Sequence, residues 1–386
     1  MGLPGLLDAH VGPHGNWQGL SLGWVAAVWL SPILSQADHR MNQVQAWASE
    51  RRVTLRICIG QAVRALDLSD DRLAAVVEAL SDDARWTAFE SALTRPVVRV
   101  YELPVERVRL DSTTASGHHG VTEDGLFPFG HSKDHRPDLP QVKVMLSTLD
   151  PLGLPVAMEV LPGDRADDPL YRPAIERVRA SLEQRGLLYV GDAKMAALAT
   201  RAHVQAGGDY YLCPLTAIQV PTEQWTALLT PVWADQQPLE TITREQPDGQ
   251  SVVLATGFEQ TVTLTDVTAG DPAEPLTWTE RQLVVRSVRQ AEAGTAALQP
   301  RLAKAQAAIL ALNERRRGKP RPRDLPSLHQ AVEAIVTRFT VTGLLQITTQ
   351  EQVQERPLRR DRDLTVSVAI DQEAVALAER RLGWRV

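Results

Sequence analysis

Apolar residues recur at helical spacing through most of the first hundred residues. A stretch without charged side chains, between Asp8 and Asp38, contains an apolar run of about 15 residues, whereas a membrane-spanning helix needs roughly 20. We therefore expect a buried helix around residues 23–30. Further helices are predicted by amphipathic patterns with polar caps, in residues 38–47, 68–80 and 81–89. Residues 1–97 thus form a predicted helical domain, whose pattern fits DNA binding and dimerisation equally well.

Near residue 98 the period of the pattern changes to two, which is typical of strands buried on one face. A long loop rich in Gly, His and Asp interrupts these strands at 112–140. The predicted strands are 98–101, 105–111, 141–149, 155–161, 187–190 and 210–213, and the predicted helices are 168–185 and 193–206.

Counted from residue 105, the predicted order is β-β-β-α-β-α-β. This order is the layout of an RNase H-like mixed sheet flanked by helices, an α/β fold in which the first and fourth strands are neighbours. Asp111 ends the first strand and Asp192 directly follows the fourth. We expect their carboxylates to meet, although 81 residues separate them in sequence. Residues 98–214 are the predicted first part of this core.

After residue 214 the pattern becomes a mixture of short β-prone runs and Ala-rich helical segments. We assign 215–370 to a mixed α+β insertion domain and 371–386 to the start of a return to the core. The predicted elements are strands at 251–254, 261–264, 276–278, 339–348 and 364–370, a helical pair or hairpin in 281–314, and helices at 325–336 and 371–381.

Composition narrows the class of protein. The 386 residues are 44% hydrophobic and 23% charged, which excludes wholesale disorder. Cys58 and Cys213 form neither a disulfide framework nor a zinc-binding spacing, so a reducing, cytoplasmic location is the simplest expectation. The first residues carry no basic segment, which argues against a signal peptide.

The net charge of −6 at first argues against a nucleic-acid partner, because such proteins usually carry a basic surplus. Residues 281–330, however, contain 11 Lys and Arg against 3 Asp and Glu. This local surplus suits a DNA backbone, although a solvated helix face would also explain it. The total charge is an average over unlike domains and does not exclude DNA.

Two carboxylates on adjacent strands repel each other unless a cation neutralises them. Mg²⁺ or Mn²⁺ does so, and a pair of such ions forms the clamp used in phosphodiester displacement. Asp111 and Asp192 are therefore candidate metal ligands. The alternative is that Asp111 caps a turn and Asp192 is the N-cap of a helix.

Three segments carry a resemblance to a known family. They are Leu-Asp-Ser-Thr-Thr at 110–114, the run Gly-Leu-Phe-Pro-Phe-Gly-His-Ser-Lys-Asp-His-Arg-Pro-Asp-Leu-Pro-Gln-Val-Lys at 125–143, and Tyr-Val-Gly-Asp-Ala-Lys-Met at 189–195. They resemble the catalytic-domain motifs of bacterial insertion-sequence transposases of the DDE class, and the resemblance extends from about residue 30 to the C-terminus.

The resemblance implies an RNase H-like fold interrupted by an insertion domain. It also implies magnesium-dependent nicking of transposon ends and strand transfer into target DNA, by a homodimer on paired double-stranded ends. Asp111 and Asp192 match the first two acids of the family's catalytic triad.

The third acid of that triad is a glutamate on a helix beyond a strand that begins much like residues 382–386. We expect no third catalytic glutamate in these 386 residues, and Glu373 and Glu379 are read as a solvated helix face. The sequence therefore predicts a truncated or frameshifted transposase, or one half of a split reading frame, that holds one metal ion weakly and has little or no cleavage activity.

Other residues are candidates for contacts with DNA. Lys133, Arg136 and Lys143 are predicted phosphate contacts at the rim of the site, and a basic loop adds Arg315, Arg316, Arg317 and Lys319. His118, His119 and His131 are irregularly spaced, which favours a place on this rim over a zinc site. Ser112 lacks the Gly-x-Ser-x-Gly elbow of a serine hydrolase.

Two other functions remain open. A non-catalytic, DNA-binding regulator would bind transposon ends without cutting them. A generic RNase H-like nuclease would have no connection with terminal repeats.

Overall fold

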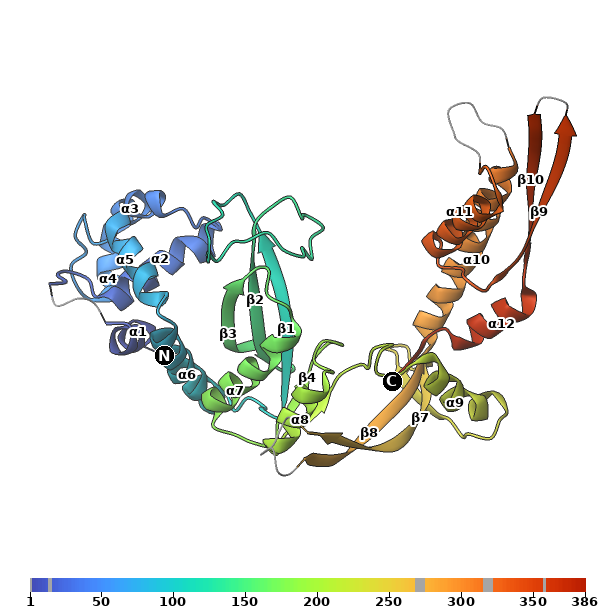
Figure 1. The fold of residues 1–386 in the computed structure, drawn as a ribbon. Coiled ribbons are helices and arrows are strands. Elements are labelled where there is room, and N and C mark those ends of the chain that lie inside the picture. Colours follow the sequence, from blue (N-terminus) through green and yellow to red (C-terminus); the bar gives the residue numbers. More distant parts are fainter. Residues whose placement is uncertain (1, 13–15, 268–274, 315–321, 357–358) are drawn as a thin grey trace. The chain divides into compact units, whose positions relative to one another are not determined.

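The structure is a computed structural model that describes residues 2–12, 16–267, 275–314, 322–356 and 359–386. The chain divides into two compact units, each described here by itself. Unit 1 comprises Met1–Pro214 and Thr265–Trp278, and unit 2 comprises Leu215–Leu264 and Thr279–Val386. Helices and sheets of both kinds make this a mixed α/β chain (Figure 1). No helix in the described residues has the length and apolar character to cross a bilayer.

Unit 1 begins with a cluster of helices whose apolar faces share one core. The predicted buried helix is confirmed, with Val25 and Val28 among its buried residues. Buried Asp67 ties the cluster together, because it accepts hydrogen bonds from the Arg72 guanidinium and the Arg64 amide, each at 2.7 Å. The helices are α1 (Leu3–His10), α2 (Leu22–Gln36), α3 (Met41–Glu50), α4 (Arg52–Ile59), α5 (Asp70–Leu80) and α6 (Asp83–Val100).

The strand predicted at 98–101 is wrong. These residues are the last turn of α6 and the turn after it, and the helix continues through Pro96. Val98 packs against the core of the sheet from its place on this helix. A short run rich in β-branched residues fits a strand and a buried helix end equally well. The spacing of its apolar residues alone therefore does not distinguish the two.

A five-stranded mixed sheet follows, in the order β3-β2-β1-β4-β5. β1 is antiparallel to β2, and β2 is antiparallel to β3, whereas β4 runs parallel to both β1 and β5. Its strands are β1 (Arg107–Ser116), β2 (Gln141–Leu149), β3 (Leu154–Pro162), β4 (Leu188–Val190) and β5 (Tyr210–Leu212), and its connecting helices are η1 (Asp168–Leu170), α7 (Tyr171–Leu182) and α8 (Leu198–Ala206).

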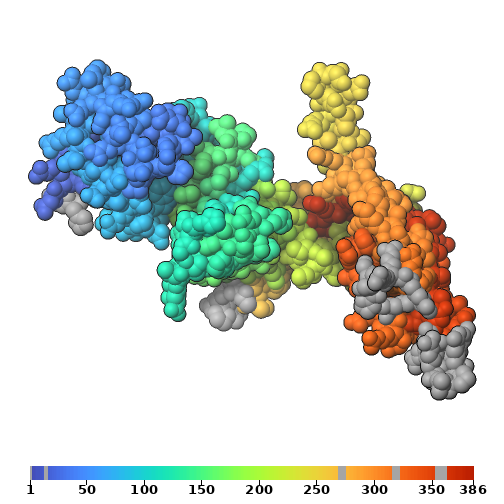
Figure 2. All heavy atoms as spheres, turned by 90° about the horizontal axis from the view of Figure 1, so that it is seen from above, coloured from blue at the N-terminus to red at the C-terminus, as the bar shows by residue number. Residues whose placement is uncertain are grey.

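The two faces of this sheet differ. On one face Val108 and Leu110 of β1 pack with Ile175 of α7 in a common core, and α7 crosses this face (Figure 1). On the other face the alternate residues Arg109 and Asp111 are exposed, although β1 is the central strand. Within the described residues the Asp111 face is therefore open. The loop 117–140 lies on the visible surface of unit 1 (Figure 2, blue-green).

Unit 2 contains most of a four-stranded sheet in the order β11-β8-β7-β6 and a two-stranded ribbon of β9 and β10. A separate core joins Leu302 and Ile309 of α10 to Leu328 of α11. β6 is exposed along its whole length and belongs to the yellow projection in Figure 2. The elements are α9 (Thr222–Trp233), β6 (Glu240–Glu245), β7 (Ser251–Asp266), β8 (Leu276–Ser287), α10 (Val288–Leu310), η2 (Ala311–Asn313), α11 (Leu325–Arg338), β9 (Leu345–Arg356), β10 (Arg359–Ile370), α12 (Gln372–Arg381) and β11 (Trp384–Arg385).

Two predictions for unit 2 need correction, and one helix is missing from the predictions. The helical pair predicted in 281–314 is the end of β8 followed by the single long helix α10, since residues 281–284 alternate between exposed and buried positions as a strand does. Helix α9 is not among the predicted elements. The strand predicted at 339–348 begins only at Leu345, because Thr340 has a positive φ of 55° that ends the preceding helix.

Residues 371–386, predicted to begin a return to the core, form α12 and β11 in unit 2. β11 pairs antiparallel with β8, with Trp384 opposite Arg286.

Candidate functional site

Asp111 lies on β1, and Asp192 follows the neighbouring strand β4 by two residues. β1 and β4 pair in parallel with Arg107 opposite Leu188 and Arg109 opposite Val190. Extended two residues beyond the end of β4, this register would place Asp111 level with Asp192. Because adjacent strands lie about 5 Å apart, we expect the two acids to lie near each other at the edge where β4 ends. Both residues are exposed.

The structure supports neither of the alternative roles considered for these acids, a turn cap for Asp111 and a helix N-cap for Asp192. Asp111 caps no turn, because it lies within β1 and pairs with Leu146 of β2. Asp192 is not the N-cap of α8, which begins at Leu198 after Ala197. Asp192 instead starts a turn, in which its Oδ1 accepts the Lys194 amide at 2.8 Å.

The turn after β4 depends on a close approach of Gly191 to Met195. A Cβ atom at Gly191 would lie 2.5 Å from Sδ and 2.9 Å from Cβ of Met195. Met195 is completely buried in the sheet core. The glycine therefore lets the turn close over this core and carry Asp192 at its surface.

A buried tyrosine also holds Asp192. The Tyr171 hydroxyl donates a hydrogen bond to Asp192 Oδ1 at 2.6 Å. Burial raises the pKa of Tyr171 strongly, and the hydrogen bond to Asp192 and the charges of Asp192, Asp111 and Asp167 raise it further. Three carboxylates thus act on one phenol, which stays protonated and acts as a donor.

A second polar cluster lies beside the site, on the covered face of β1. The Lys143 ammonium, on a residue that is 6% exposed, donates to Asp167 Oδ1 at 2.6 Å and to the Arg165 carbonyl. Buried Ser112 donates to the same Oδ1 at 3.0 Å. Burial alone would raise the pKa of Asp167, but the hydrogen bonds from Lys143 and Ser112 outweigh it and lower that pKa.

The predicted DNA-contacting cations have protein partners in the structure. Lys143 is committed to Asp167, and the Lys133 ammonium donates to the Ser112 carbonyl and, at 2.9 Å, to Ser112 Oγ. Arg136 forms a two-pronged pair with Asp138, with N–O distances of 2.9 and 2.8 Å. Their contacts with DNA remain predictions, and Lys143 is the most enclosed of the three.

Four predicted contacts, Arg315, Arg316, Arg317 and Lys319, lie outside the described residues. Among the predicted rim histidines, His119 stacks on Phe127 with ring centroids 3.9 Å apart, within the loop 117–140.

No third acid joins Asp111 and Asp192 in the described part of unit 1, where no group of three or more His, Cys, Asp or Glu is arranged to hold a metal ion. Glu373 and Glu379 lie on α12 in unit 2, where Glu379 accepts a bond from Gln299 at 3.2 Å. Mg²⁺ is commonly held by one or two carboxylates and several waters. The donor set of Asp111 and Asp192 therefore fits a single hydrated ion.

In the structure, Tyr171 and Asp167 also belong to the surroundings of the candidate site, although the sequence pattern does not point to them. Both lie in or beside the predicted helix 168–185. At such a place the local pattern predicts only that an acid begins the helix and that a tyrosine lies in the core. Tyr171 comes 21 positions before its partner Asp192. No spacing rule links them, so the sequence contains no signal for this contact.

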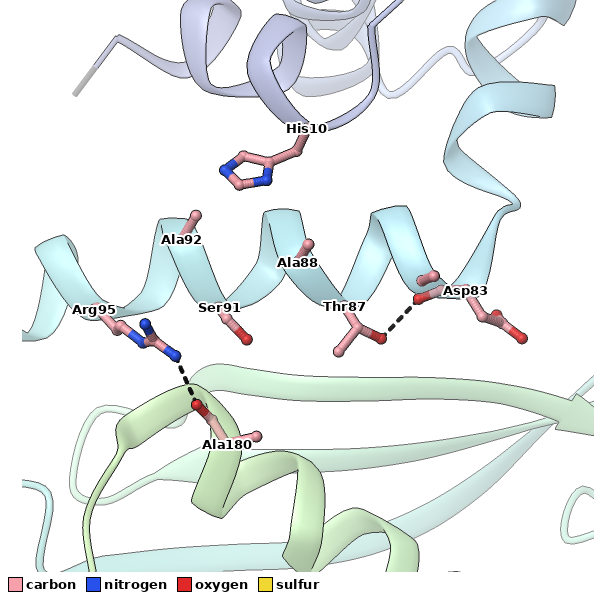
Figure 3. Close-up of a pocket in the computed structure, with 9 residues that line it drawn as sticks. His10, Asp83, Thr87, Ala88, Ser91, Ala92, Arg95 and Ala180 are labelled. Atoms are coloured by element: carbon pink, nitrogen blue, oxygen red, sulfur yellow. Dashed lines mark hydrogen bonds between the residues drawn. The ribbon is translucent and has the colours of Figure 1, made fainter.

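A separate hollow of about 670 Å³ lies between α1, α6 and α7 (Figure 3). Small residues of α6 and the His10 ring line it, and Arg95 donates to the Ala180 carbonyl at 2.8 Å. This bond and a second one, from Arg95 to the Ser181 carbonyl, dock α6 on α7.

Comparison with known proteins yields no matching family model and no matching curated protein. Among solved structures, the chain is similar to a piggyBac transposase in a synaptic complex with hairpin DNA, with a TM-score of 0.30, 10% identity, and coverage of 65% of this chain and 56% of that one. It is also similar to the Mos1 transposase in a paired-end complex with the left transposon end, with a TM-score of 0.21, 11% identity, and coverage of 54% and 70%. TM-scores this low do not by themselves establish a shared fold or activity.

Proposed function

We propose that this chain is a DDE-class transposase polypeptide of a bacterial insertion sequence, which binds transposon-end DNA at a site built on Asp111 and Asp192. The observation that carries the proposal is the parallel pairing of β1, which carries Asp111, with β4, which Asp192 follows by two residues. The strand order β3-β2-β1-β4-β5, with the first three strands antiparallel and the last two parallel, supports an RNase H-like core around them. The motif resemblance supplies the reaction class.

In this proposal Asp111 and Asp192 bind a divalent cation, Mg²⁺ or Mn²⁺, through carboxylate oxygens. A bound ion of this kind polarises a phosphodiester and lowers the pKa of an attacking oxygen. The chain's own part is to hold the two carboxylates side by side and to orient DNA phosphates against them. The open sheet face around Asp111 gives DNA access to that edge.

Two carboxylates complete one ion site but not the two-ion clamp of phosphodiester cleavage. We therefore propose that residues 1–386 bind end DNA, as a homodimer on paired ends, and cleave it slowly or not at all. A non-catalytic, regulatory role is the second candidate, and the lack of a third acid near the pair in the described residues favours it.

The test uses the purified chain and DNA duplexes taken from both flanks of its gene, with a shuffled duplex of equal length as the control. We expect gel-shift binding to prefer a flank duplex at least tenfold, and we expect Mn²⁺ binding by calorimetry to be lost in Asp111→Asn and Asp192→Asn. Equal binding to the shuffled duplex would refute the transposase assignment. Metal binding that survives both substitutions would refute the site.

The same experiment separates the candidates. A regulator binds the flank duplex equally well with and without Mg²⁺ and in the Asp111→Asn variant. A generic RNase H-like nuclease shows no preference for the flanks and cuts an RNA–DNA hybrid in Mg²⁺.

A further inference from the structure

Tyr171 is the first residue of α7 and has no exposed surface. Its neighbours Leu170 and Ala174 belong to the same core cluster, as do Val108 and Leu110 of β1. The ring is therefore held by packing between the helix and the sheet. The phenol oxygen consequently has a defined position, set by the core and independent of the surface turn that it meets.

Asp192, by contrast, lies on a turn between β4 and α8. An exposed carboxylate on such a turn would sample several rotamers, and each side-chain torsion that binding must freeze costs free energy. The bond of 2.6 Å from the Tyr171 hydroxyl ties this carboxylate to the first turn of α7.

Both side-chain hydrogen bonds of Asp192 in the described residues end on the same atom. Oδ1 accepts the Tyr171 hydroxyl at 2.6 Å and the Lys194 amide at 2.8 Å. Two hydrogen bonds to one oxygen restrain the rotation of the carboxylate. Oδ2 is then the oxygen left for an external ligand.

We propose that Tyr171 is a positioning residue, which fixes the Asp192 carboxylate so that Oδ2 is presented to a divalent cation shared with Asp111. This inference rests on the proposed metal site. Hydrogen-bond partners behind a metal ligand typically change metal affinity by about 10–100-fold when they are removed. This hydrogen bond is present before any DNA is bound. Its loss should therefore change the affinity of the free protein for the metal ion.

Tyr171→Phe removes the donor and keeps the ring that fills the core. Tyr189→Phe is a matched control, because Tyr189 is equally buried in the same core. The charges that act on the Tyr189 hydroxyl are those of Asp209, Arg179 and Glu176, away from Asp192. The two variants therefore lose the same atom at the same depth, and only one of them touches the proposed site.

The experiment measures Mn²⁺ affinity by calorimetry and the tyrosine ultraviolet difference spectrum on Mn²⁺ addition, with thermal unfolding as a check on folding. We expect Tyr171→Phe to bind Mn²⁺ about tenfold more weakly. We also expect this variant to lose the difference spectrum that the wild type and Tyr189→Phe retain. Asp192→Asn serves as the reference without metal binding.

Three results would overturn the inference, and they separate it from the proposed function. If Tyr171→Phe binds Mn²⁺ as the wild type does while Asp192→Asn does not, the positioning role is wrong and the metal site stands. If Tyr189→Phe weakens binding as much as Tyr171→Phe does, the effect is one of core stability. If Asp192→Asn binds Mn²⁺ normally, the metal site itself fails, and this inference with it.

Discussion

The ion pair of Arg179 and Asp209 joins α7 to the residue just before β5, the strand that pairs with β4. The Asp209 side chain is fully buried, and its two oxygens accept the Arg179 Nε at 2.7 Å and the Leu187 amide at 3.0 Å. The Arg179 side chain is itself only 5% exposed. Asp209→Ala therefore removes the buried carboxylate from the Arg179 guanidinium, which keeps only the half-exposed Glu176, and removes the acceptor of the amide just before β4.

Removing one partner of a buried pair costs about 3–5 kcal/mol, because the remaining charge loses its compensation in a place that water does not reach. We expect Asp209→Ala to lower the free energy of unfolding of unit 1 by this amount. The assay is urea unfolding followed by circular dichroism, with the midpoint and the slope of the transition compared between wild type and variant.

Glu176→Ala is the matched control, since Glu176 contacts the same guanidinium at 2.5 Å but is 53% exposed. Solvent screens such a pair, so its loss should cost less than about 1 kcal/mol. The reasoning fails if Asp209→Ala costs less than about 1 kcal/mol, or if the two variants are equally destabilised.

Three further predictions concern particular contacts. Asp67→Ala should destabilise the N-terminal helices by about 3 kcal/mol, measured by urea unfolding, because it strips the buried acceptor from Arg72; an unchanged midpoint would contradict this. Gly191→Ala should cost about 1–3 kcal/mol in thermal unfolding, since its Cβ would overlap Met195, and wild-type stability would show that the turn has room. The lowered pKa of Asp167 means that its ionised form adds stability above its ordinary pKa, and this contribution is lost as the pH falls through the lowered value. The Asp167→Asn variant should therefore lose less stability than the wild type between about pH 5 and pH 2, and parallel curves would refute this.

Much of the local structure of the sheet could be predicted from sequence. The strand predicted at 141–149 is confirmed at Gln141–Leu149, and the first strand is confirmed with an extension to Ser116. Alternating apolar residues report which side of a strand is buried, and β1 is long enough for that signal to be clear. The candidate acids Asp111 and Asp192 could be named because each lies at or next to such a strand.

Tertiary structure decided what those residues meet. A period of two describes one strand and carries no information on its neighbour, so only the tertiary structure shows that β1, with Asp111, pairs with β4, which Asp192 follows. Lys143 alternates along its strand like a surface residue, yet it is buried because Asp167 approaches from the segment before α7. The bond from Tyr171 to Asp192 arises in the same way, from the packing of a helix over a sheet. Sequence thus determined the elements and the candidate chemistry, whereas the contacts that orient this chemistry depend on long-range packing that no local pattern encodes.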